Sequence, residues 1–274
     1  MTTRLRSEAR RLDAAVAAAS GLTRTQARAL ILAGKVRVDD VPATKPGGTV
    51  REGARIAVAE RPRFVSRGGD KLAGALDAFR IDPAGLDALD VGASTGGFTD
   101  ALLQAGARGV TALDVGYGQL AWQLREDPRV TVVERTNFRL LADDAFPGGF
   151  DLIVVDASFI SLRTIAARAV GYLRDGGAIV ALVKPQFEAG RERLRGSGGV
   201  VRDAAVHAAV LHDVRASLRA HGLEVVDAAI SPLRGPSGNI EFFFLLRRSG
   251  SGIDDAALDA LVERAHGAPQ DAGD

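Results

Sequence analysis

The chain has 274 residues, 46% hydrophobic and 25% charged, which is enough for one substantial core and a small second domain. It contains no cysteine, which excludes disulfides, iron–sulfur clusters and thiolate zinc sites, and its four histidines lack metal-ligand spacing. No segment approaches the roughly 18 apolar residues that cross a bilayer, and the start lacks the apolar stretch of a signal peptide. We therefore expect a cytoplasmic protein with no membrane segment and no bound metal.

The formal net charge of +1 hides an uneven distribution along the chain. Residues 1–67 carry 14 Lys and Arg against 6 Asp and Glu, a net charge of +8, whereas the remaining 207 residues have a net charge of −7. A basic domain of this kind favours contact with phosphates, because bound Lys and Arg release the counterions that surround a nucleic acid. A solvated basic surface is the alternative interpretation.

Two helices are predicted at the start of the chain. Residues 7–19 are rich in alanine and repeat apolar side chains at helical spacing, and Gly21 ends this helix. Thr23 can cap a second helix, which stops at Gly34. The sequence thus predicts a helix pair.

The next residues alternate between apolar and charged side chains, which predicts a strand with Lys35 and Arg37 on one exposed face. The chain then turns at Asp39 and Asp40, and a further strand is predicted over residues 55–58. The segments RLD, GLTRTQARALILAGKVRVDD and GARIAV resemble the small RNA-binding domain of ribosomal protein S4, where the helix pair and the adjoining turn clamp a shaped RNA element. Most members have glycine where Asp40 stands, and Asp tolerates that backbone conformation better than most residues.

Charge and resemblance together give a set of candidate RNA contacts. They lie in an S4-like RNA-binding domain predicted for residues 1–60 and in a basic linker predicted for residues 61–67, which Pro62 stiffens. The candidates are Arg4, Arg6, Arg11, Arg24, Arg28, Lys35, Arg37, Arg61, Arg63 and Arg67.

An apolar run over residues 86–91 is followed at once by the glycine-rich sequence GASTGGFTD and by a helical pattern. Glycines let the backbone approach a ligand closely, and the helix that begins near Phe98 directs its N–H groups at a carboxylate or phosphate. A second strand ends at Asp114, 24 residues after Asp90, where an acidic side chain commonly binds the ribose hydroxyls of an adenosine. NAD and S-adenosylmethionine both fit this arrangement.

The glycine spacing separates the two cofactors. GASTGGFT lacks the G-x-G-x-x-G spacing of a dinucleotide site, whereas D-x-G-x-x-x-G-G-F-T resembles the first motif of the FtsJ-like methyltransferases, which implies S-adenosylmethionine. A turn with no ligand would make the position of Asp114 a coincidence. Asn137, in ERTNFR after the third strand, is expected near the adenine or the substrate. The predicted cofactor-binding residues are Asp90, Gly92, Ala93, Ser94, Gly96, Gly97, Phe98, Asp114, Val115, Asn137 and Asp156.

Polar residues stand at the ends of several predicted strands. Asp156 ends FDLIVV, Lys184 ends AIVALV and Glu241 begins EFFFLL, while Lys71 follows the turn SRGGD and opens a helix. The carboxyl ends of parallel strands line the ligand crevice of a doubly wound sheet, so we expect Asp114, Asp156 and Lys184 to converge there. Each residue alone has a structural explanation, as a solvated charge or a helix cap, but together with the loop they indicate a site.

The order Lys, Asp, Lys, Glu resembles the tetrad of the FtsJ-like 2′-O-methyltransferases, which implies Lys71, Asp156, Lys184 and Glu241 as catalytic residues. A ribose hydroxyl is a weak acid that must lose its proton as it attacks the methyl group. A partly buried lysine beside a second lysine can have its pKa lowered toward neutrality. We predict that Lys184 is this group, that the other three position it, and that alignment of oxygen, methyl and sulfur supplies most of the rate.

The motifs VSRGGDKL, DVGASTGGFTD, LDVGYGQLAW, ERTNFR, DLIVVDASFISL, LVKPQFEAGR and GPSGNIEFF occur in the order seen in the TlyA family, which joins an RNA-binding domain to an FtsJ-like methyltransferase. The resemblance runs from about Arg4 to Leu246. It implies 2′-O-methylation of cytidines in 16S ribosomal RNA, 23S ribosomal RNA or both, at the interface of the ribosomal subunits. The start MTTRLRSEARR resembles the longer members of the family, which modify both subunits.

Three alternatives belong to other classes of function. A haemolysin, a name sometimes attached to this family, needs a signal peptide, a spanning helix or a long amphipathic stretch. An RNA-binding ribosome assembly factor without catalytic activity is not expected to keep the whole tetrad. A small-molecule methyltransferase leaves the basic N-terminal domain without a role.

The expected fold is α/β, with a doubly wound, Rossmann-like methyltransferase sheet over residues 68–248 after the small α+β domain. Residues 183–203 are rich in glycine and are expected to form a mobile segment that closes over the substrate, and residues 249–274 a short helix and a flexible tail. Parallel strands are expected near residues 86–91, 109–114, 130–134, 151–156 and 178–184, with 224–231 and an antiparallel 241–248 at the far edge.

Overall fold

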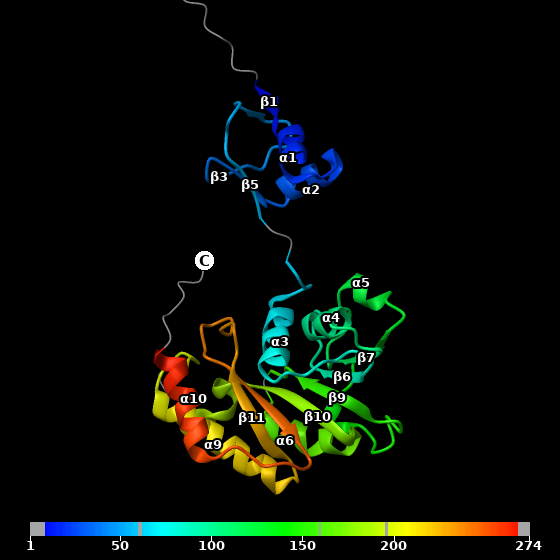
Figure 1. The fold of residues 1–274 in the computed structure, drawn as a ribbon, viewed down its shortest axis with the longest axis vertical. Helices are drawn as coiled ribbons and strands as arrows, with labels where there is room; N and C mark the ends of the chain where they lie inside the picture. Colours follow the sequence, from blue (N-terminus) through cyan, green and yellow to red (C-terminus); the bar gives the residue numbers. More distant parts are fainter. Residues whose placement is uncertain (1–8, 60–61, 159, 195–196, 268–274) are drawn as a thin grey trace, which may run out of the picture. The chain divides into compact units, whose positions relative to one another are not determined.

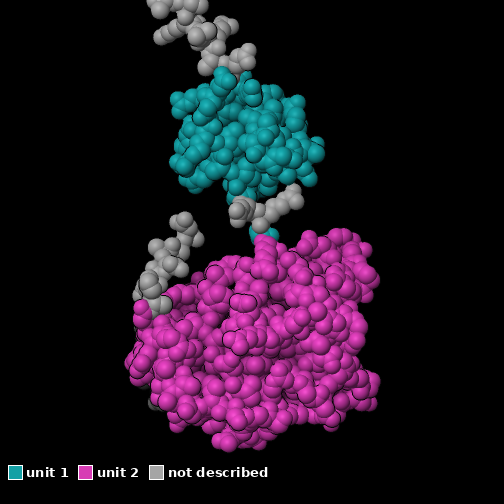
Figure 2. Space-filling model, in the orientation of Figure 1, with its two compact units in different colours: residues 1–62 teal, residues 63–274 magenta. Residues whose placement is uncertain are grey.

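The computed structural model describes residues 9–59, 62–158, 160–194 and 197–267. The chain divides into two compact units, Met1–Pro62 and Arg63–Asp274, which are coloured separately in Figure 2. The boundary lies within the segment suggested as a linker. Three of the candidate RNA contacts lie outside the described residues, namely Arg4, Arg6 and Arg61.

The first unit combines the helix pair with short strands. Strand β2 pairs antiparallel with both β3 and β5, and β1 pairs antiparallel with β4. A small apolar core, which includes Val16, Ile31 and Val36, joins the helices to the strands. The helices are α1 (Leu12–Ser20) and α2 (Arg24–Leu32), and the strands are β1 (Arg10–Arg11), β2 (Val36–Val38), β3 (Val41–Pro42), β4 (Thr49–Val50) and β5 (Ile56–Val58).

Local sequence explains the ends of these elements. Gly21 has a φ of 67° and ends α1, and the side chains of Thr23 and Gln26 each accept a hydrogen bond from the other's backbone N–H to start α2. Asp39 and Asp40 have φ values of 48° and 65°, as the two central residues of a type I′ hairpin turn require. The predicted turn is therefore confirmed although neither position is glycine.

The second unit is built around a seven-stranded sheet with the order β11-β12-β10-β9-β6-β7-β8. The five strands from β10 to β8 are parallel, and β12 runs antiparallel between β10 and β11. The predicted α/β class is confirmed, with the refinement that β11 rather than β12 forms the edge. The strands are β6 (Asp87–Val91), β7 (Gly109–Leu113), β8 (Val130–Val133), β9 (Phe150–Val155), β10 (Leu173–Val183), β11 (Glu224–Ile230) and β12 (Phe242–Arg247).

Helices cover both faces of this sheet (Figure 1). Helices α6, α9 and α10 contribute to the core on one face, and α3, α4 and α5 contribute to the core on the other. The helices are α3 (Arg67–Ala78), α4 (Gly97–Gln104), α5 (Trp122–Arg125), α6 (Leu162–Ala169), α7 (Pro185–Glu188), α8 (Gly190–Arg193), α9 (Ala204–Ala220) and α10 (Asp255–Gly267), with 3₁₀ turns η1 (Phe138–Leu140) and η2 (Val170–Tyr172).

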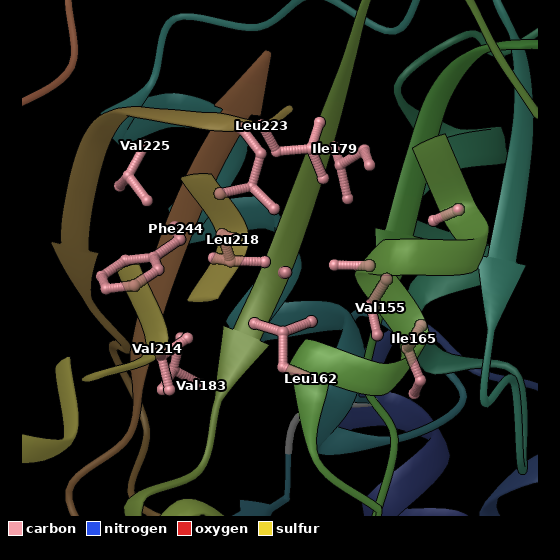
Figure 3. Close-up of a cluster of buried hydrophobic side chains, with 14 of the residues drawn as sticks. Val155, Leu162, Ile165, Ile179, Val183, Val214, Leu218, Leu223, Val225 and Phe244 are labelled. Atoms are coloured by element: carbon pink, nitrogen blue, oxygen red, sulfur yellow. The ribbon is translucent and has the colours of Figure 1, made fainter. Parts of the chain in front are cut away.

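Strand β10 shows why the central strands are continuous apolar runs. Ile179 and Val183 belong to the core on the α9 face, whereas Val180 and Leu182 belong to the opposite core. Successive side chains of a strand point to opposite faces, and here each face is covered by helices. Figure 3 shows Ile179 and Val183 on the face that Leu218 of α9 also covers.

Helix α3 begins earlier than predicted, because SRGGD supplies its N-cap and first turn instead of a loop. A Cβ atom on Gly69 would lie 2.2 Å from Cγ of Phe64, and one on Gly97 would lie 2.8 Å from the backbone nitrogen of Gly69. These glycines therefore permit the N-terminal turns of α3 and α4 to pack closely. Sequence pattern alone suggests a turn at such a glycine pair.

Residues 183–203, expected to be mobile, and residues 249–274, expected to form a short helix and a tail, both contain helices in their described parts. Residues 183–203 include α7 and α8, and Glu188 accepts hydrogen bonds from Ser161 Oγ at 2.7 Å and the Leu162 N–H at 2.6 Å. The expectation of a segment without packed elements is wrong there. Helix α10 is the helix expected near the C-terminus, and it buries Leu258 and Leu261 in the core. The expected tail beyond it lies outside the described residues.

None of the helices in the described part of the chain is long and apolar enough to cross a membrane.

Candidate active site

A cavity of about 680 Å³ opens at the carboxyl ends of the central parallel strands. Its walls come from the start of α3, the loop after β6, the ends of β9 and β10, and the turn before β12. This is the crevice expected of a doubly wound sheet. All four predicted catalytic residues line it, namely Lys71, Asp156, Lys184 and Glu241.

Lys71 and Glu241 form a buried ion pair across this cavity wall. Lys71 Nζ lies 2.5 Å from Glu241 Oε2, and the two residues are 7% and 1% exposed. The pair joins the second turn of α3 to the start of β12. Gln186 Nε2 also lies 3.5 Å from Glu241 Oε1, and a Cβ atom on Gly235 would come within 2.5 Å of the same oxygen. Glycine at 235 therefore leaves room for the carboxylate.

Lys184 and Asp156 form the second ion pair of the cavity. Lys184 Nζ lies 2.5 Å from Asp156 Oδ1 and donates a hydrogen bond to Ser158 Oγ at 2.9 Å. Lys184 is 9% exposed and directly precedes Pro185, the first residue of α7. The structure thus brings Asp156 and Lys184 together as expected. It gives each lysine its own carboxylate partner, whereas the sequence reasoning placed the two lysines against each other.

The glycine-rich loop forms the neighbouring wall. Gly92 has a φ of 90°, and a Cβ atom there would lie 2.7 Å from the carbonyl oxygen of Asp156. Gly96 has a φ of 95°, and a Cβ atom there would lie 2.3 Å from Cδ1 of Leu124. A side chain at either position would collide with the fold as well as strain the backbone. The loop residues that line the cavity are Gly92, Ala93, Ser94, Thr95, Gly97 and Phe98.

Asp114 holds this loop from the end of β7. Its Oδ2 accepts a hydrogen bond from the Ser94 N–H at 2.8 Å, and its Oδ1 accepts one from the Gly116 N–H at 2.7 Å. Each carboxylate oxygen can accept a further hydrogen bond. Asp114 lies beside the loop but does not line the cavity. Of the three residues expected to converge, Asp156 and Lys184 do line it, and Asp114 reaches it only through the loop that it holds.

Besides Asp114 and Gly96, three further predicted cofactor-binding residues do not line the cavity. Asp90 is fully buried beneath the loop, where it accepts a hydrogen bond from Thr99 Oγ1 at 2.7 Å. Burial raises the pKa of Asp90 to about 7. Asn137 is exposed and caps η1 by accepting the Arg139 N–H, and Val115 is 69% exposed next to Asp114.

Sequence reasoning missed several residues of the cavity. Ser158 and Gln186 contact the charged residues, as described above, and Arg234 also lines the cavity. Asn239 is buried and ties two segments together, because its Oδ1 accepts the Val201 N–H at 2.9 Å and its Nδ2 donates to the carbonyl oxygen of Gly199 at 3.1 Å. A serine after a strand and an asparagine in a glycine turn have ordinary structural explanations, so the sequence offers no signal for them.

The basic residues of the first unit differ in their availability. Arg11 and Arg24 both bind the buried Asp13, at 2.9 Å and 3.2 Å, and these contacts hold the pKa of that carboxyl well below its usual range. Arg28 and Lys35 are exposed, and neither forms an ion pair with another described residue.

Three other predicted RNA contacts have partners within the protein. Arg37 donates to the carbonyl oxygen of Asp40, at the hairpin turn of the first unit. In the second unit, Arg63 stacks over Phe64 at 4.7 Å and Arg67 donates to the carbonyl oxygen of Arg234 at 3.2 Å. All three arginines remain exposed, so these contacts do not hide their charges.

Within the residues that the structure describes, no group of three or more histidine, aspartate or glutamate side chains could hold a metal ion.

Comparisons with known proteins agree with the division into two units. Residues 64–248 match the FtsJ-like methyltransferase family, and residues 10–56 match the S4 domain. The 16S/23S rRNA (cytidine-2'-O)-methyltransferase TlyA of Mycobacterium tuberculosis (strain H37Rv) is 49% identical over 250 residues, which cover 88% of this chain and 92% of that protein. Hemolysin A of Brachyspira hyodysenteriae is 38% identical over 221 residues, which cover 80% and 92%.

A solved structure supports the same assignment. A protein from Streptococcus thermophilus that carries a hemolysin name superposes with a TM-score of 0.73 and 39% sequence identity. The match covers 95% of this chain and 97% of that one, so it spans both units.

Proposed function

Because the chain belongs to the FtsJ-like methyltransferase family, within the TlyA group that adds an S4 domain, we propose that it methylates the 2′-hydroxyl of cytidine riboses in ribosomal RNA. The substrate is a ribosomal subunit in the cytoplasm, and the methyl donor is S-adenosylmethionine. One observation supports this most strongly: two lysine–carboxylate pairs lie in one cavity beside the glycine-rich loop.

The residues around the loop fit S-adenosylmethionine. A ligand can approach the backbone at Gly92 and Gly97, and the cavity volume falls within the range of about 300–1,000 Å³ that is usual for small-molecule sites. The two oxygens of Asp114, held by backbone N–H groups, can each accept a ribose hydroxyl. The adjacent N-termini of α3 and α4 offer N–H groups for the carboxylate of the methionine portion.

S-adenosylmethionine, when bound, supplies a methyl group on a positively charged sulfur that is a good leaving group. The ribose hydroxyl then needs an acceptor for its proton as its oxygen bonds to the methyl carbon. We assign this acceptor to Lys184, whose Nζ must first give up to solvent the proton of its ion pair with Asp156. Its Nζ is held by Asp156 and Ser158, so the ammonium that forms is stabilised by a carboxylate already 2.5 Å away.

Lys71 has a different part in this proposal. Its ammonium is fixed by Glu241 at 2.5 Å, in the wall of the same cavity. A fixed positive charge stabilises negative charge that develops on the attacking oxygen, and it does so without having to reorganise during the reaction. Glu241 is then a positioning residue that acts through Lys71.

The direct test is methylation of ribosomal subunits. The purified protein is incubated with labelled S-adenosylmethionine and unmodified 30S or 50S subunits, and labelled positions are mapped by their resistance to alkaline hydrolysis. We expect label on a cytidine ribose in one or both RNAs. RNA binding without label in either RNA would contradict this function and would indicate an assembly factor instead.

A pair of variants tests the role of Lys184. Lys184→Ala should lower the rate of methyl transfer at least about 100-fold while S-adenosylmethionine still binds. Lys184→Arg keeps the positive charge, but its guanidinium does not give up a proton in proteins. Loss of activity in both variants supports a base, whereas substantial activity in Lys184→Arg would show that only an oriented cation is needed.

A further inference from the structure

A second cavity, of about 360 Å³, shares Arg234 and Ser237 with the active-site cavity. Its other walls include Arg202, which follows the glycine-rich segment, and His266 at the end of α10. Valine and isoleucine side chains complete it, and neither aspartate nor glutamate is among the described residues that line it. The cavity therefore combines apolar walls with basic side chains.

The two arginines of this second cavity carry charge that the protein does not neutralise. Arg202 and Arg234 are exposed, and neither forms an ion pair with a carboxylate in the described part of the chain. Within the described residues, the Arg234 guanidinium donates one hydrogen bond, to the carbonyl oxygen of Gly238 at 3.2 Å. The carboxylate next to Arg202, that of Asp203, instead accepts the Ala205 N–H and caps α9. Both guanidinium groups can therefore bind an anion.

Buried contacts hold the walls of the second cavity in place. Asn239 fixes the backbone at Gly199 and Val201 against the turn that carries Arg234 and Ser237. His207, which is fully buried in α9, lies with its Nδ1 2.8 Å from Nε2 of His266. A site whose supports are fixed before binding loses less conformational freedom when the ligand arrives.

We propose that this second cavity binds a phosphodiester group of the RNA next to the methylated ribose, with Arg202 and Arg234 as its ligands and Ser237 as a hydroxyl donor. The proposal rests on the function proposed above. A ribose at Lys184 is linked to a phosphate on each side, so the RNA backbone must leave the active-site cavity through its opening. Arg234 and Ser237 stand where that cavity adjoins the second one. Bidentate arginine contacts suit a phosphate.

The test compares three variants of the full chain: Arg202→Gln, Arg234→Gln and the double variant. Arg264→Gln is the matched control, because it removes the same charge from an exposed position of α10 that lines neither cavity. We expect each cavity variant to raise KM for ribosomal subunits about tenfold, as loss of a charged hydrogen bond would. The dependence of log KM on log salt should weaken by about one unit per arginine, and the Kd for S-adenosylmethionine should stay unchanged.

The outcomes separate this proposal from the proposed function. Wild-type protein that methylates RNA, together with cavity variants that keep the wild-type KM, contradicts the phosphate site alone. An equal rise of KM in Arg264→Gln contradicts it too, because the effect would then come from general surface charge. Weaker binding of S-adenosylmethionine by Arg234→Gln would assign that residue to the cofactor. Absence of methylation by the wild type overturns both proposals.

Discussion

Among single residues, Lys71 and Glu241 place opposite charges side by side where little solvent reaches them. Removing one partner of such a pair leaves the other charge buried without compensation. We expect Glu241→Gln to lower the free energy of unfolding by about 3 kcal/mol, measured by urea denaturation. The control Glu224→Gln breaks a pair with Arg219, whose side chain is 75% exposed, and should cost less than about 1 kcal/mol.

A second variant separates lost charge pairing from lost packing at this position. Lys71→Met combined with Glu241→Gln removes the stranded ammonium, so it should recover most of the stability that Glu241→Gln loses. Wild-type stability in Glu241→Gln, or no recovery in the double variant, would contradict a buried ion pair. Neither the single nor the double variant should retain normal methyl transfer if Lys71 acts as proposed.

Asp90 links stability to pH at the residue scale. Its pKa is raised to about 7 by burial, so the folded state holds a proton that the unfolded state, near 3.8, has released. The stability that the folded state gains from neutral Asp90 is fully present below pH 3.8 and is lost as the pH rises through about 7. Asp90→Asn removes this pH dependence, because asparagine does not ionise. The unfolding free energy of the variant relative to wild type should therefore rise between pH 4 and 7, by at most about 4 kcal/mol.

Denaturation at several pH values measures this effect. Asp144→Asn is a suitable control, because Asp144 is exposed and forms no ion pair with a described residue. Its stability relative to wild type should not change with pH. A constant difference between Asp90→Asn and wild type from pH 4 to 8 would mean that Asp90 is ionised in the folded protein.

The sequence predicts which residues stand at the site better than it predicts their partners. Asp156 and Lys184 are recognisable because a polar residue directly ends an apolar run, and parallel strands bring such ends together. The pairing of Lys71 with Glu241 depends on how α3 packs against the sheet, over a separation of 170 residues. Ser158 has no signal of its own, because its role exists only through Lys184 Nζ.

Among the elements, the docking of α10 on α9 should be sensitive to acid. His207 is fully buried between Phe242 and His266, and burial lowers its pKa to about 4, with the charge of His266 adding to the effect. As the pH falls, His207 is therefore protonated in the unfolded state, near its ordinary pKa of 6.5, before it is protonated in the folded state. Stability from this group is complete above pH 6.5 and falls as the pH drops toward 4.

His207→Gln tests this docking. The variant should gain stability relative to wild type as the pH falls from 6.5 to 4, and the protection of α10 amides against hydrogen exchange, relative to their intrinsic rates, should fall less on acidification than in wild type. His221→Gln is the control, since His221 is exposed at the end of α9 and should leave the wild-type pH dependence intact. Equal acid sensitivity in wild type and His207→Gln would place the acid-sensitive contact elsewhere.

Element positions follow from local patterns where those patterns have one meaning. Gly21, Thr23 and the strand periodicity predict the ends and types of elements correctly. The start of α3 was missed because glycines at 68 and 69 weaken a helix by propensity, and only the packing of Phe64 and Gly97 against them explains their presence. The pairing of β12 with β10 depends on contacts between residues far apart in the sequence, which the apolar pattern of each strand does not specify.

For the whole molecule, protonation of Asp90 and protonation of His207 have opposite effects on the free energy of unfolding. Between about pH 4 and 6.5 the folded state holds a proton on Asp90, while the unfolded state holds one on His207. Their effects on stability have opposite signs in that window, so the wild type should change little there on their account. The single variants at Asp90 and His207 should then shift the pH dependence in opposite directions.

At the same scale, the sequence predicts where positive charge gathers but not which charges are available. The net charge of +8 over residues 1–67 needs no structure, whereas the binding of Arg11 and Arg24 to buried Asp13 does. Arg24→Gln should therefore disturb the first unit as well as RNA binding. Arg28 and Lys35 are better probes, because no ion pair with a described residue depends on them.

We expect Arg28→Gln combined with Lys35→Gln to weaken binding to ribosomal subunits and to lower the slope of log Kd against log salt by about two, one unit for each phosphate that is no longer neutralised. Binding of S-adenosylmethionine should not change, because the cofactor residues lie in the other unit. Arg219→Gln with Arg264→Gln removes the same charge from the second unit and controls for net charge. Filter binding at several salt concentrations measures all three proteins. An unchanged slope in the variant would show that Arg28 and Lys35 do not contact RNA phosphates. An equal loss of slope in the control would show that the basic unit attracts RNA only through general surface charge.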